Sequence, residues 1–351
     1  MYILLVGPSG IRKGTAMIPG MSLLRELAIP MSAEYETRES LIRTLKKANV
    51  TETDTLDDYA HINEDGTVTQ KSTRISFHSS LTIFSEEFTV FLGYNNPQLM
   101  SDLSNWYDCG PRWQYRTKNA GTDDITGVFV NLIGATTPDL IQSALPIDSI
   151  GGGLTSRIIF VFADTLEKVV PFPFPTEDEK AQRKILFSDL EQIHGMRGEF
   201  HLDEGAMKFW EKWYTVNHHE KPFKDSRFSG YVSRRPQHIL KMSMIISASL
   251  SADFSITKEI LGESISFLKE TEIPMPRTFA GLGRSEQAQT IASMQDTIRR
   301  AESISEAELI KAYQLDANIR EIDSMLLAMS RMKLIRMVEE VEGRMIYWVG
   351  K

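Results

Sequence analysis

One stretch near the start of the chain combines the residue types that hold a phosphate group. It follows an apolar run at residues 2–6, precedes a stretch with helical spacing, and reads Gly7, Pro8, Ser9, Gly10, Ile11, Arg12, Lys13, Gly14, Thr15. A phosphate needs converging backbone N–H groups, a helix N-terminus and one mobile cation. The glycines let the backbone curl, and Lys13 would reach the β- and γ-phosphates of a nucleotide. The sequence therefore predicts a loop that binds ATP.

This stretch departs from the usual phosphate-loop pattern, G-x-x-x-x-G-K-[ST], at two positions. Arg12 stands where the last glycine is usual, and Gly14 stands where a hydroxyl residue usually contacts Mg²⁺. The next hydroxyl, Thr15, comes one place later. We expect Mg²⁺ to accompany ATP, with Thr15 and Glu86 as its candidate ligands. A plain glycine turn between a strand and a helix is the alternative.

An acid pair follows the apolar run at residues 81–84. Glu86 and Glu87 stand just beyond the end of this run. Nucleotide hydrolysis uses one acid that organises Mg²⁺ and a neighbouring group that positions the attacking water. By position, Glu86 would organise the metal and Glu87 would polarise the water. The alternative is an exposed acidic strand end without a chemical role.

Two later positions complete the set of candidate catalytic residues. Thr136 and Thr137 follow the apolar run at residues 128–133. Thr136, or as second choice Thr137, could sense the γ-phosphate. The alternative is that these threonines cap a helix. Arg157 follows a glycine run and precedes the apolar run at residues 158–162. Such an arginine could reach the γ-phosphate of a neighbouring subunit and stabilise developing charge. A local salt bridge is the alternative for Arg157.

These side chains need a scaffold, and the pattern of apolar residues predicts one. The four apolar runs are short and nearly continuous, which is typical of strands buried on both faces of a parallel sheet. We therefore expect an α/β domain with a mostly parallel sheet over residues 1–168. A proline-punctuated segment at residues 170–175 would end it.

The rest of the chain is predicted to be mainly helical. A lid-like region over residues 176–272 shows helical spacing at 177–193, 204–217, 236–250 and 257–271. The last part, residues 284–351, reads as helices at 286–301, 305–313 and 318–332, followed by strands at 334–338 and 345–349. Three helices followed by a β-hairpin is the pattern of a winged-helix domain.

The order of these features resembles the AAA+ ATPases. The helical region adds a segment, residues 233–241, that looks like the second sensor of AAA+ lids, an arginine at a helix start that contacts the γ-phosphate; Arg234 or Arg235 would hold this role. The chain is most similar to phage- and plasmid-encoded AAA+ ATPases of the replicative helicase and primase-helicase kind, over about residues 1–270. Supporting phrases lie at residues 37–45, 84–92, 132–140 and 153–161.

This resemblance implies an ATP-hydrolysing motor, a ring-forming DNA helicase that assembles as a hexamer and works with other replication proteins. Larger relatives carry a primase-like region ahead of the phosphate loop. In this sequence the loop begins at Gly7, so we do not expect priming. The sequence departs from the family pattern at Arg12 and Gly14, and also at Glu86, a position where aspartate is usual. These departures leave open how Mg²⁺ is held. Two other readings remain. The loop resembles that of adenylate kinase, which suggests a nucleotide kinase, and a non-motor AAA+ loader or regulator would share the same motifs.

A segment rich in aromatic and basic residues lies between the acid pair and Thr136. Aromatic stacking combined with cations for the backbone is the chemistry of single-stranded nucleic-acid binding. We expect single-stranded DNA as the partner, with candidate contacts at Arg112, Trp113, Arg116 and Lys118. A β-hairpin that packs its aromatic rings in the core is the alternative. Residues 301–351 contain more acidic than basic residues, which argues against strong duplex binding there.

The composition excludes several other classes of protein. Of the 351 residues, 42% are hydrophobic and 25% are charged, which is globular composition rather than that of a disordered or fibrous chain. A net charge of −8 argues against a general nucleic-acid coat, and the single cysteine, Cys109, excludes an intrachain disulfide or a cysteine-cluster zinc site. No apolar run approaches about 18 residues, and no basic segment opens a signal peptide. We therefore expect a cytoplasmic protein without a membrane partner.

Overall fold

The computed structural model describes residues 1–34, 36–55, 73–93, 96–117, 121–145, 151–166, 168, 170–217, 222–223, 225–279, 286–340 and 343–350. The chain divides into two compact units, Met1–Ala280 and Gly281–Lys351. The predicted α/β core and the predicted helical region therefore fall in the first unit. The boundary between the two units lies in the gap between residue 272 and residue 284, where the predicted last region begins.

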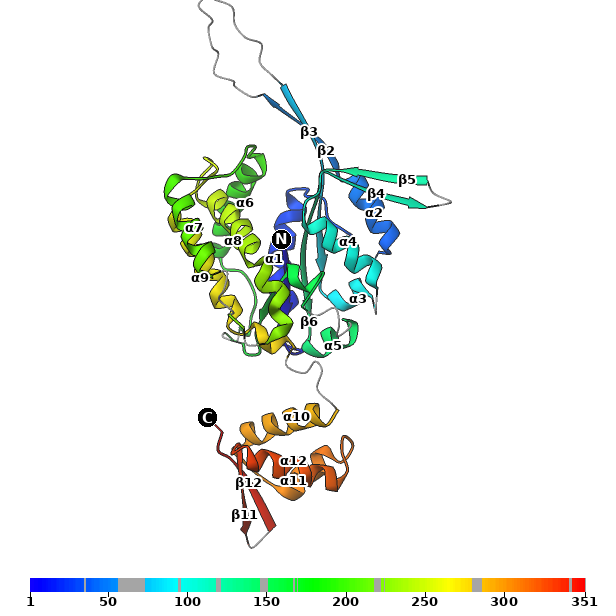
Figure 1. Ribbon diagram of the computed structural model, residues 1–351, viewed down its shortest axis with the longest axis vertical. Helices are drawn as coiled ribbons and strands as arrows, with labels where there is room; N and C mark the ends of the chain where they lie inside the picture. The colour runs from blue at the N-terminus through cyan, green and yellow to red at the C-terminus, as the bar shows by residue number, and fades with distance from the viewer. Residues whose placement is uncertain are drawn as a thin grey trace, which may run out of the picture. The chain divides into compact units, whose positions relative to one another are not determined.

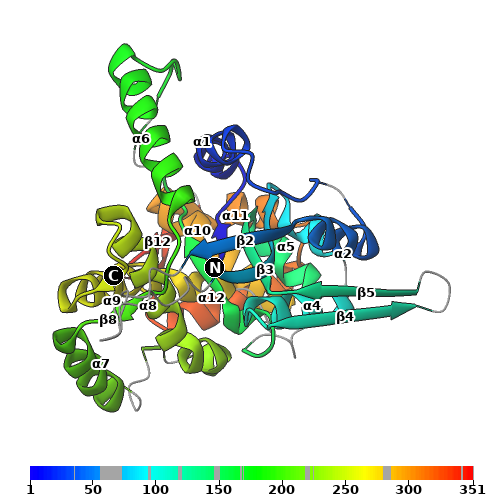
Figure 2. The same ribbon diagram turned by 90° about the horizontal axis from the view of Figure 1, so that it is seen from above.

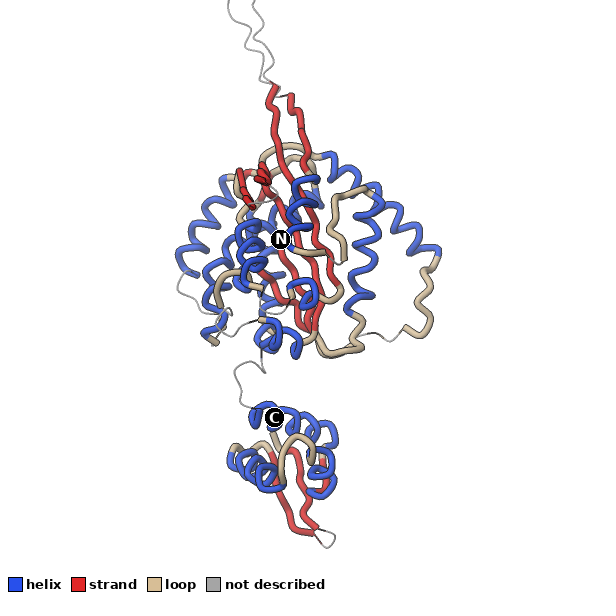
Figure 3. The backbone as a smooth tube through the Cα atoms, turned by 90° about the vertical axis from the view of Figure 1, so that its right-hand side faces the viewer, coloured by secondary structure: helices blue, strands red, loops and turns tan. Residues whose placement is uncertain are grey.

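A five-stranded sheet forms the centre of the first unit. Its strands, in spatial order, are β2 (Asn49–Thr55), β3 (Thr73–Ser85), β6 (Val128–Thr136), β1 (Tyr2–Val6) and β7 (Ile158–Phe162). All neighbours pair in parallel except β2, which runs antiparallel to β3. The expectation of an α/β fold with a mostly parallel sheet is confirmed. Strand β3 is longer than its apolar run because pairing with β2 extends it past the helices (Figure 3).

Helices cover this sheet on both faces. They are α1 (Lys13–Glu26), α2 (Arg38–Lys47), α3 (Phe88–Leu92), α4 (Pro97–Tyr107) and α5 (Pro138–Ala144). Figure 2 shows α1 and α4 on opposite sides of the strands. The buried side chains of the strands, such as Leu4, Ile83, Leu132 and Phe160, form the core between these layers. Burial of both sheet faces explains why the strands read as nearly continuous apolar runs.

An antiparallel hairpin connects α4 to β6. It consists of β4 (Arg112–Thr117) and β5 (Gly121–Thr126) and extends sideways from the sheet (Figure 1). The aromatic and basic segment therefore forms a hairpin, in which Trp113 and Tyr115 are half-buried.

The remainder of the first unit is helical, as predicted. It contains α6 (Glu177–Gly195), α7 (Glu204–Asn217), α8 (Ser229–Leu250) and α9 (Lys258–Glu272), with a short parallel pair, β8 (His201–Leu202) and β9 (Ser255–Ile256). The predicted start of α8 at residue 236 is wrong, because Pro236 lies inside this helix. The turn of α8 before Pro236 is held by side-chain hydrogen bonds to α9. Arg235 and Tyr231 both donate to Glu272.

The second unit has three helices and a three-stranded antiparallel sheet. In chain order these are α10 (Glu286–Ala301), β10 (Ser303–Ser305), α11 (Glu306–Tyr313), α12 (Ile319–Arg331), β11 (Ile335–Glu340) and β12 (Gly343–Trp348). Capping boxes at Ser305 and Asn318 mark the starts of α11 and α12. The three predicted helices and two predicted strands are confirmed, and β10 was not predicted. In the described parts of both units, no helix is long and apolar enough to span a membrane.

Candidate functional site

The sheet brings several of the candidate residues to one edge. Strands β1, β3 and β6 are parallel, with Val6 opposite Thr136 and Ser85 opposite Gly134. Their carboxyl ends therefore meet at the same edge. Residues 7–12, here called the glycine loop, follow β1, and the acid pair follows β3. In open α/β sheets, ligands bind outside the carboxyl ends of the strands.

The glycine loop offers backbone donors for which the described residues show no acceptor. Among the described residues, the N–H groups from Ser9 to Thr15 have no recorded acceptor, and the next N–H, that of Ala16, bonds to the Arg12 carbonyl. Gly10 and Arg12 have φ angles of +84° and +60°, so the loop curls through the left-handed region. A loop of this kind with free N–H groups at a helix start can bind an anion.

Gly7 is required at its position by a close approach of the backbone. A Cβ on residue 7 would lie 2.2 Å from the carbonyl oxygen of Ala163, which follows β7. The Gly7 N–H donates to the Thr136 carbonyl at 3.3 Å. These contacts attach the start of the loop to both neighbouring strands.

Lys13 folds back over the glycine loop. Its Nζ donates to the carbonyl oxygens of Gly7 at 2.7 Å and Pro8 at 2.9 Å. Burial lowers the pKa of the Lys13 ammonium, and the charge of Glu87 opposes this effect. The ammonium thus binds the loop carbonyls and is close enough to Glu87 for its charge to act on it.

The acid pair lies beside the first turn of α1. A Cβ on Gly14 would be 3.2 Å from Oε2 of Glu86, and both Glu86 and Glu87 are exposed. Mg²⁺ is usually held by one or two carboxylates, water and substrate phosphates rather than by a full protein cage. The described residues contain no cluster of three His, Cys, Asp or Glu side chains that could form such a cage. Glu86 therefore fits Mg²⁺ bound together with a phosphate. Thr15 is exposed and one residue further round the helix, about 100° from Gly14.

Thr136 and Thr137 differ in what they do. Thr136 is buried, and its hydroxyl donates to the Thr137 carbonyl at 3.4 Å. The Thr137 hydroxyl accepts from the Leu140 N–H at 3.3 Å and caps α5. The capping alternative therefore describes Thr137, and Thr136 lies next to Gly7 at the loop.

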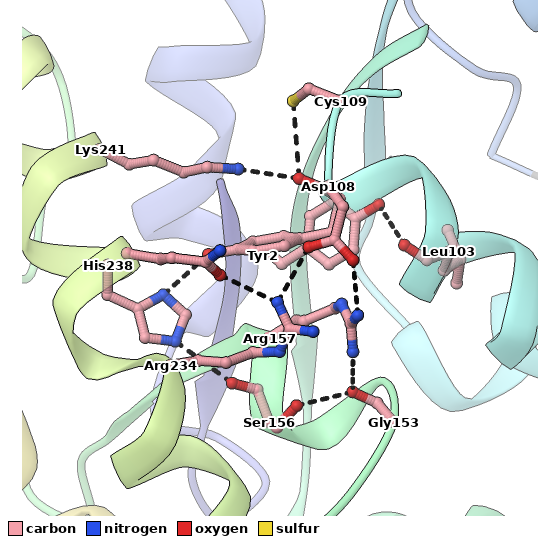
Figure 4. A network of polar contacts seen from close by, with 12 residues as sticks. Tyr2, Leu103, Asp108, Cys109, Gly153, Ser156, Arg157, Arg234, His238 and Lys241 are labelled. Atoms are coloured by element: carbon pink, nitrogen blue, oxygen red, sulfur yellow. Dashed lines mark hydrogen bonds and ion pairs between the residues drawn. The ribbon is translucent and has the colours of Figure 1, made fainter. Parts of the chain in front are cut away.

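Arg157 and Arg234 lie elsewhere, at the opposite edge of the sheet. Strand β7 begins with Ile158 opposite Tyr2, so Arg157 stands at the amino end of β1 and the glycine loop at its carboxyl end. A five-residue strand separates them, roughly 15 Å. Arg157 and Arg234 bind the same carboxylate, that of Asp108, at 2.6 and 2.9 Å (Figure 4). The structure thus joins these two candidates to each other and not to Lys13.

The structure also corrects the prediction that Arg234 stands at a helix start. Arg234 does not stand at a helix start, because α8 begins at Ser229. The other choice, Arg235, forms a buried ion pair with Glu272 at 2.7 Å, with both side chains about 95% buried. Arg235 therefore holds α8 against α9.

The candidate DNA contacts are mostly engaged within the hairpin. The Trp113 ring meets the buried Trp106 ring edge-on at 5.4 Å and stacks on Tyr115. Arg112 pairs with Asp124, and this hydrogen bond holds the pKa of the Asp124 carboxyl at about 2. Arg116 bonds to the Thr122 hydroxyl at 3.0 Å, and Lys118 lies outside the described residues. The Trp113 and Tyr115 rings therefore pack on their neighbours and stay partly exposed.

Asp108 is the functional candidate that the sequence reasoning missed. It sits inside the segment that was read as aromatic and basic, immediately after Trp106 and Tyr107. The sequence signal that could have identified Asp108 is a lone acid among cations.

Searches against models of protein families and against curated protein sequences found no match for this chain.

Proposed function

We propose that this chain is an ATP-hydrolysing motor of the AAA+ kind, a ring-forming DNA helicase of phage or plasmid replication. The observation that carries the proposal is the carboxyl edge of the sheet, where Lys13, the acid pair and N–H groups without an acceptor among the described residues lie together. A plain glycine turn would need neither the free donors nor the nearby carboxylates.

In this proposal each group at the edge has one task. The N–H groups of residues 9–15 hold the β- and γ-phosphates, and Lys13 leaves the Gly7 and Pro8 carbonyls to neutralise them. Mg²⁺ would supply positive charge that neutralises the phosphates. Glu86 holds the metal, and Glu87 accepts a hydrogen bond from the attacking water and orients it. Thr136, beside Gly7, supports the loop and lies where it could sense the γ-phosphate.

The position of Arg157 supports an oligomer. An arginine at the amino edge of the sheet cannot reach the phosphate at its own carboxyl edge, so a phosphate contact has to come from another copy. We therefore propose a ring, in the form of a hexamer.

The second unit and the hairpin supply weaker support for DNA contact. The helix–strand–helix–helix–hairpin order of residues 286–348 supports a winged-helix domain. Arg344 on its β12 strand is already paired with Glu339 and Glu306, so we propose contact with a protein or weak contact with DNA there. Single-stranded DNA at the β4–β5 hairpin would have to break the Arg112–Asp124 pair.

The decisive experiment measures ATP turnover with and without single-stranded DNA, together with unwinding of a forked duplex. Lys13→Ala should abolish turnover while Lys208→Ala, an exposed lysine of α7, should behave as wild type. Wild-type turnover in a folded Lys13→Ala protein would remove the proposal. Turnover without DNA stimulation or unwinding would favour the loader or regulator. Phosphate transfer to nucleoside monophosphates would favour the kinase.

A further inference from the structure

A short segment between β7 and α6 exposes two aromatic rings. Residues 170–175, here called the Pro–Phe segment, alternate proline and phenylalanine after Val170. Phe172 and Phe174 are 75% and 78% exposed, more than any other phenylalanine in the described part of the chain. Each proline fixes its own φ angle, so the segment loses little conformational entropy when it binds. Exposed rings on a stiff segment are typical of a docking element.

Both ends of the Pro–Phe segment are attached beside α1 of the same chain. The Val170 carbonyl accepts a hydrogen bond from Arg12 of the glycine loop at 3.4 Å. Helix α6 follows the segment, and its Arg183 binds Glu26 of α1 at 2.6 Å. Figure 2 shows α6 extending beside α1 and away from α7. No residue of α6 is buried. The segment and α6 therefore leave their apolar side chains open to a partner.

An open cavity at the end of α9 has room for such rings. Its volume is about 610 Å³, and most of its wall is apolar, formed by Pro222, Phe223, Ile273 and Pro276. A cavity of about 150 Å³ holds one benzene ring, so this one can accept both phenylalanine rings. Ile273 is 79% exposed, and covering so much apolar surface is favourable. The cavity therefore suits aromatic anchors of a protein partner.

The charges that line this cavity leave one cation over. Arg235 pairs with Glu272, and Asp225 pairs with Arg227. Lys269 also lines the cavity and is exposed, and the described residues show no ion pair for it. The described lining therefore attracts a partner that carries a negative charge close to its aromatic rings.

A negative charge of this kind follows the Pro–Phe segment. Three acids open α6, and two of them, Glu177 and Glu179, have partners at the start of the same helix. The third, Asp178, is exposed and has no recorded partner in the part of the chain that the structure describes. It stands three residues beyond the segment. The segment thus combines two rings and an acid, and the cavity combines an apolar wall and a cation.

We propose that the Pro–Phe segment of one copy docks into this cavity of a second copy, with Phe172 and Phe174 inserted and Asp178 facing Lys269. This inference rests on the oligomer of the proposed function and names a contact between its copies. Each copy carries one segment and one cavity, so the contact is head-to-tail and can continue around a ring. Two phenylalanines bury about 300–500 Å², against about 1,200–2,000 Å² for a stable interface. The contact therefore strengthens a larger interface.

A labelled peptide of residues 170–180 tests the cavity on the full chain, with fluorescence anisotropy as the readout. The peptide should bind saturably, and its variant with Phe172→Ser and Phe174→Ser should bind at least about thirtyfold more weakly. In the protein, Ile273→Asp should weaken binding about tenfold and keep the wild-type melting temperature, because this side chain is exposed. Ile319→Asp, which changes an isoleucine of α12 that is 61% exposed, is the matched control and should bind as wild type does.

Charge reversal in the full chain tests the contact between copies, with sedimentation velocity as the readout. Lys269→Glu and Asp178→Lys should each raise the protein concentration needed for assembly about threefold at low ionic strength, because each places like charges together. The double variant restores opposite charges and should assemble as wild type does. Asp189→Lys, which reverses another exposed acid of α6, is the control and should not be rescued by Lys269→Glu.

The expected result is weaker peptide binding by Ile273→Asp together with restored assembly of the double variant. A peptide that fails to bind, or that binds Ile273→Asp as tightly as wild type, would overturn the docking site. Assembly that Ile273→Asp leaves unchanged would give the cavity to a different protein and overturn the second copy as its occupant. A double variant that assembles no better than the single variants would overturn the contact of Asp178 with Lys269. None of these measurements uses ATP, so a chain without ATP turnover would overturn the proposed function separately.

Discussion

The Glu86 carboxylate lies directly against Gly14: its Oε2 is 3.2 Å from the position that a Cβ of residue 14 would take. The acid that follows β3 therefore occupies space that a larger residue would fill at the start of α1. If Mg²⁺ binds as proposed, this contact places a carboxylate where the usual hydroxyl at position 14 is missing.

Gly14→Ala should impair the use of Mg²⁺. The added methyl group has to displace Glu86 by a few tenths of an ångström. We expect the Mg²⁺ concentration for half-maximal turnover to rise about tenfold, as when a ligand is misplaced. Gly20→Ala is the matched control in the same helix, because a Cβ there has nothing within 4 Å. An equal Mg²⁺ dependence in the two variants would argue against Glu86 as the metal ligand.

Glu87→Gln should separate binding from hydrolysis. The amide keeps the shape of the side chain but is a poor acceptor for the proton of water. ATP binding should remain normal, and turnover should fall at least about a hundredfold. Glu204→Gln, an exposed acid at the start of α7, is the control. If Glu86→Gln behaves in this way and Glu87→Gln does not, the two acids exchange roles.

Breaking the Arg235–Glu272 pair should destabilise the fold strongly, without a direct effect on catalysis. Because both side chains are buried, removing either one leaves an unpaired buried charge, and Arg235→Ala should lower the free energy of unfolding by about 3–5 kcal/mol. Replacing both residues, as Arg235→Met with Glu272→Leu, should recover much of this loss. Urea unfolding measures the free energy of unfolding of Arg235→Ala and of the double variant. A loss below about 1 kcal/mol for Arg235→Ala would indicate an exposed pair instead.

Stability should rise with pH between about 4 and 6.5 through His238. Burial lowers the pKa of the His238 imidazole to about 4, and its ring nitrogens contact the Tyr107 hydroxyl and the Ser156 carbonyl. In this window the unfolded chain binds a proton that the folded chain does not, so the free energy of unfolding increases by up to about 1.4 kcal/mol per pH unit. His238→Gln should remove this part of the slope in urea unfolding measured from pH 4 to 7. An unchanged slope would mean that the pKa of His238 does not differ between the folded and unfolded chain.

The sequence by itself determined the elements whose signals are local. Short apolar runs marked four strands because both faces of this sheet are buried, and the glycines with Lys13 marked the loop between β1 and α1. Ser305 and Asn318 stand directly before helices because a side-chain cap acts over three residues. Since parallel strands present their carboxyl ends at one edge, the meeting of the loop with Glu86 also followed from the sequence.

Only the tertiary structure determined the contacts of residues whose partners are far along the chain. Asp108 is 49 residues from Arg157 and 126 from Arg234, and no local pattern encodes such a contact. Glu272 likewise sets the role of Arg235 and supports the turn that precedes Pro236, which local propensity would end. The rings of Trp106 and Trp113 could have faced a nucleic acid or each other. Packing decided in favour of each other, because burying apolar surface against a neighbouring element lowers the free energy more than leaving it in water.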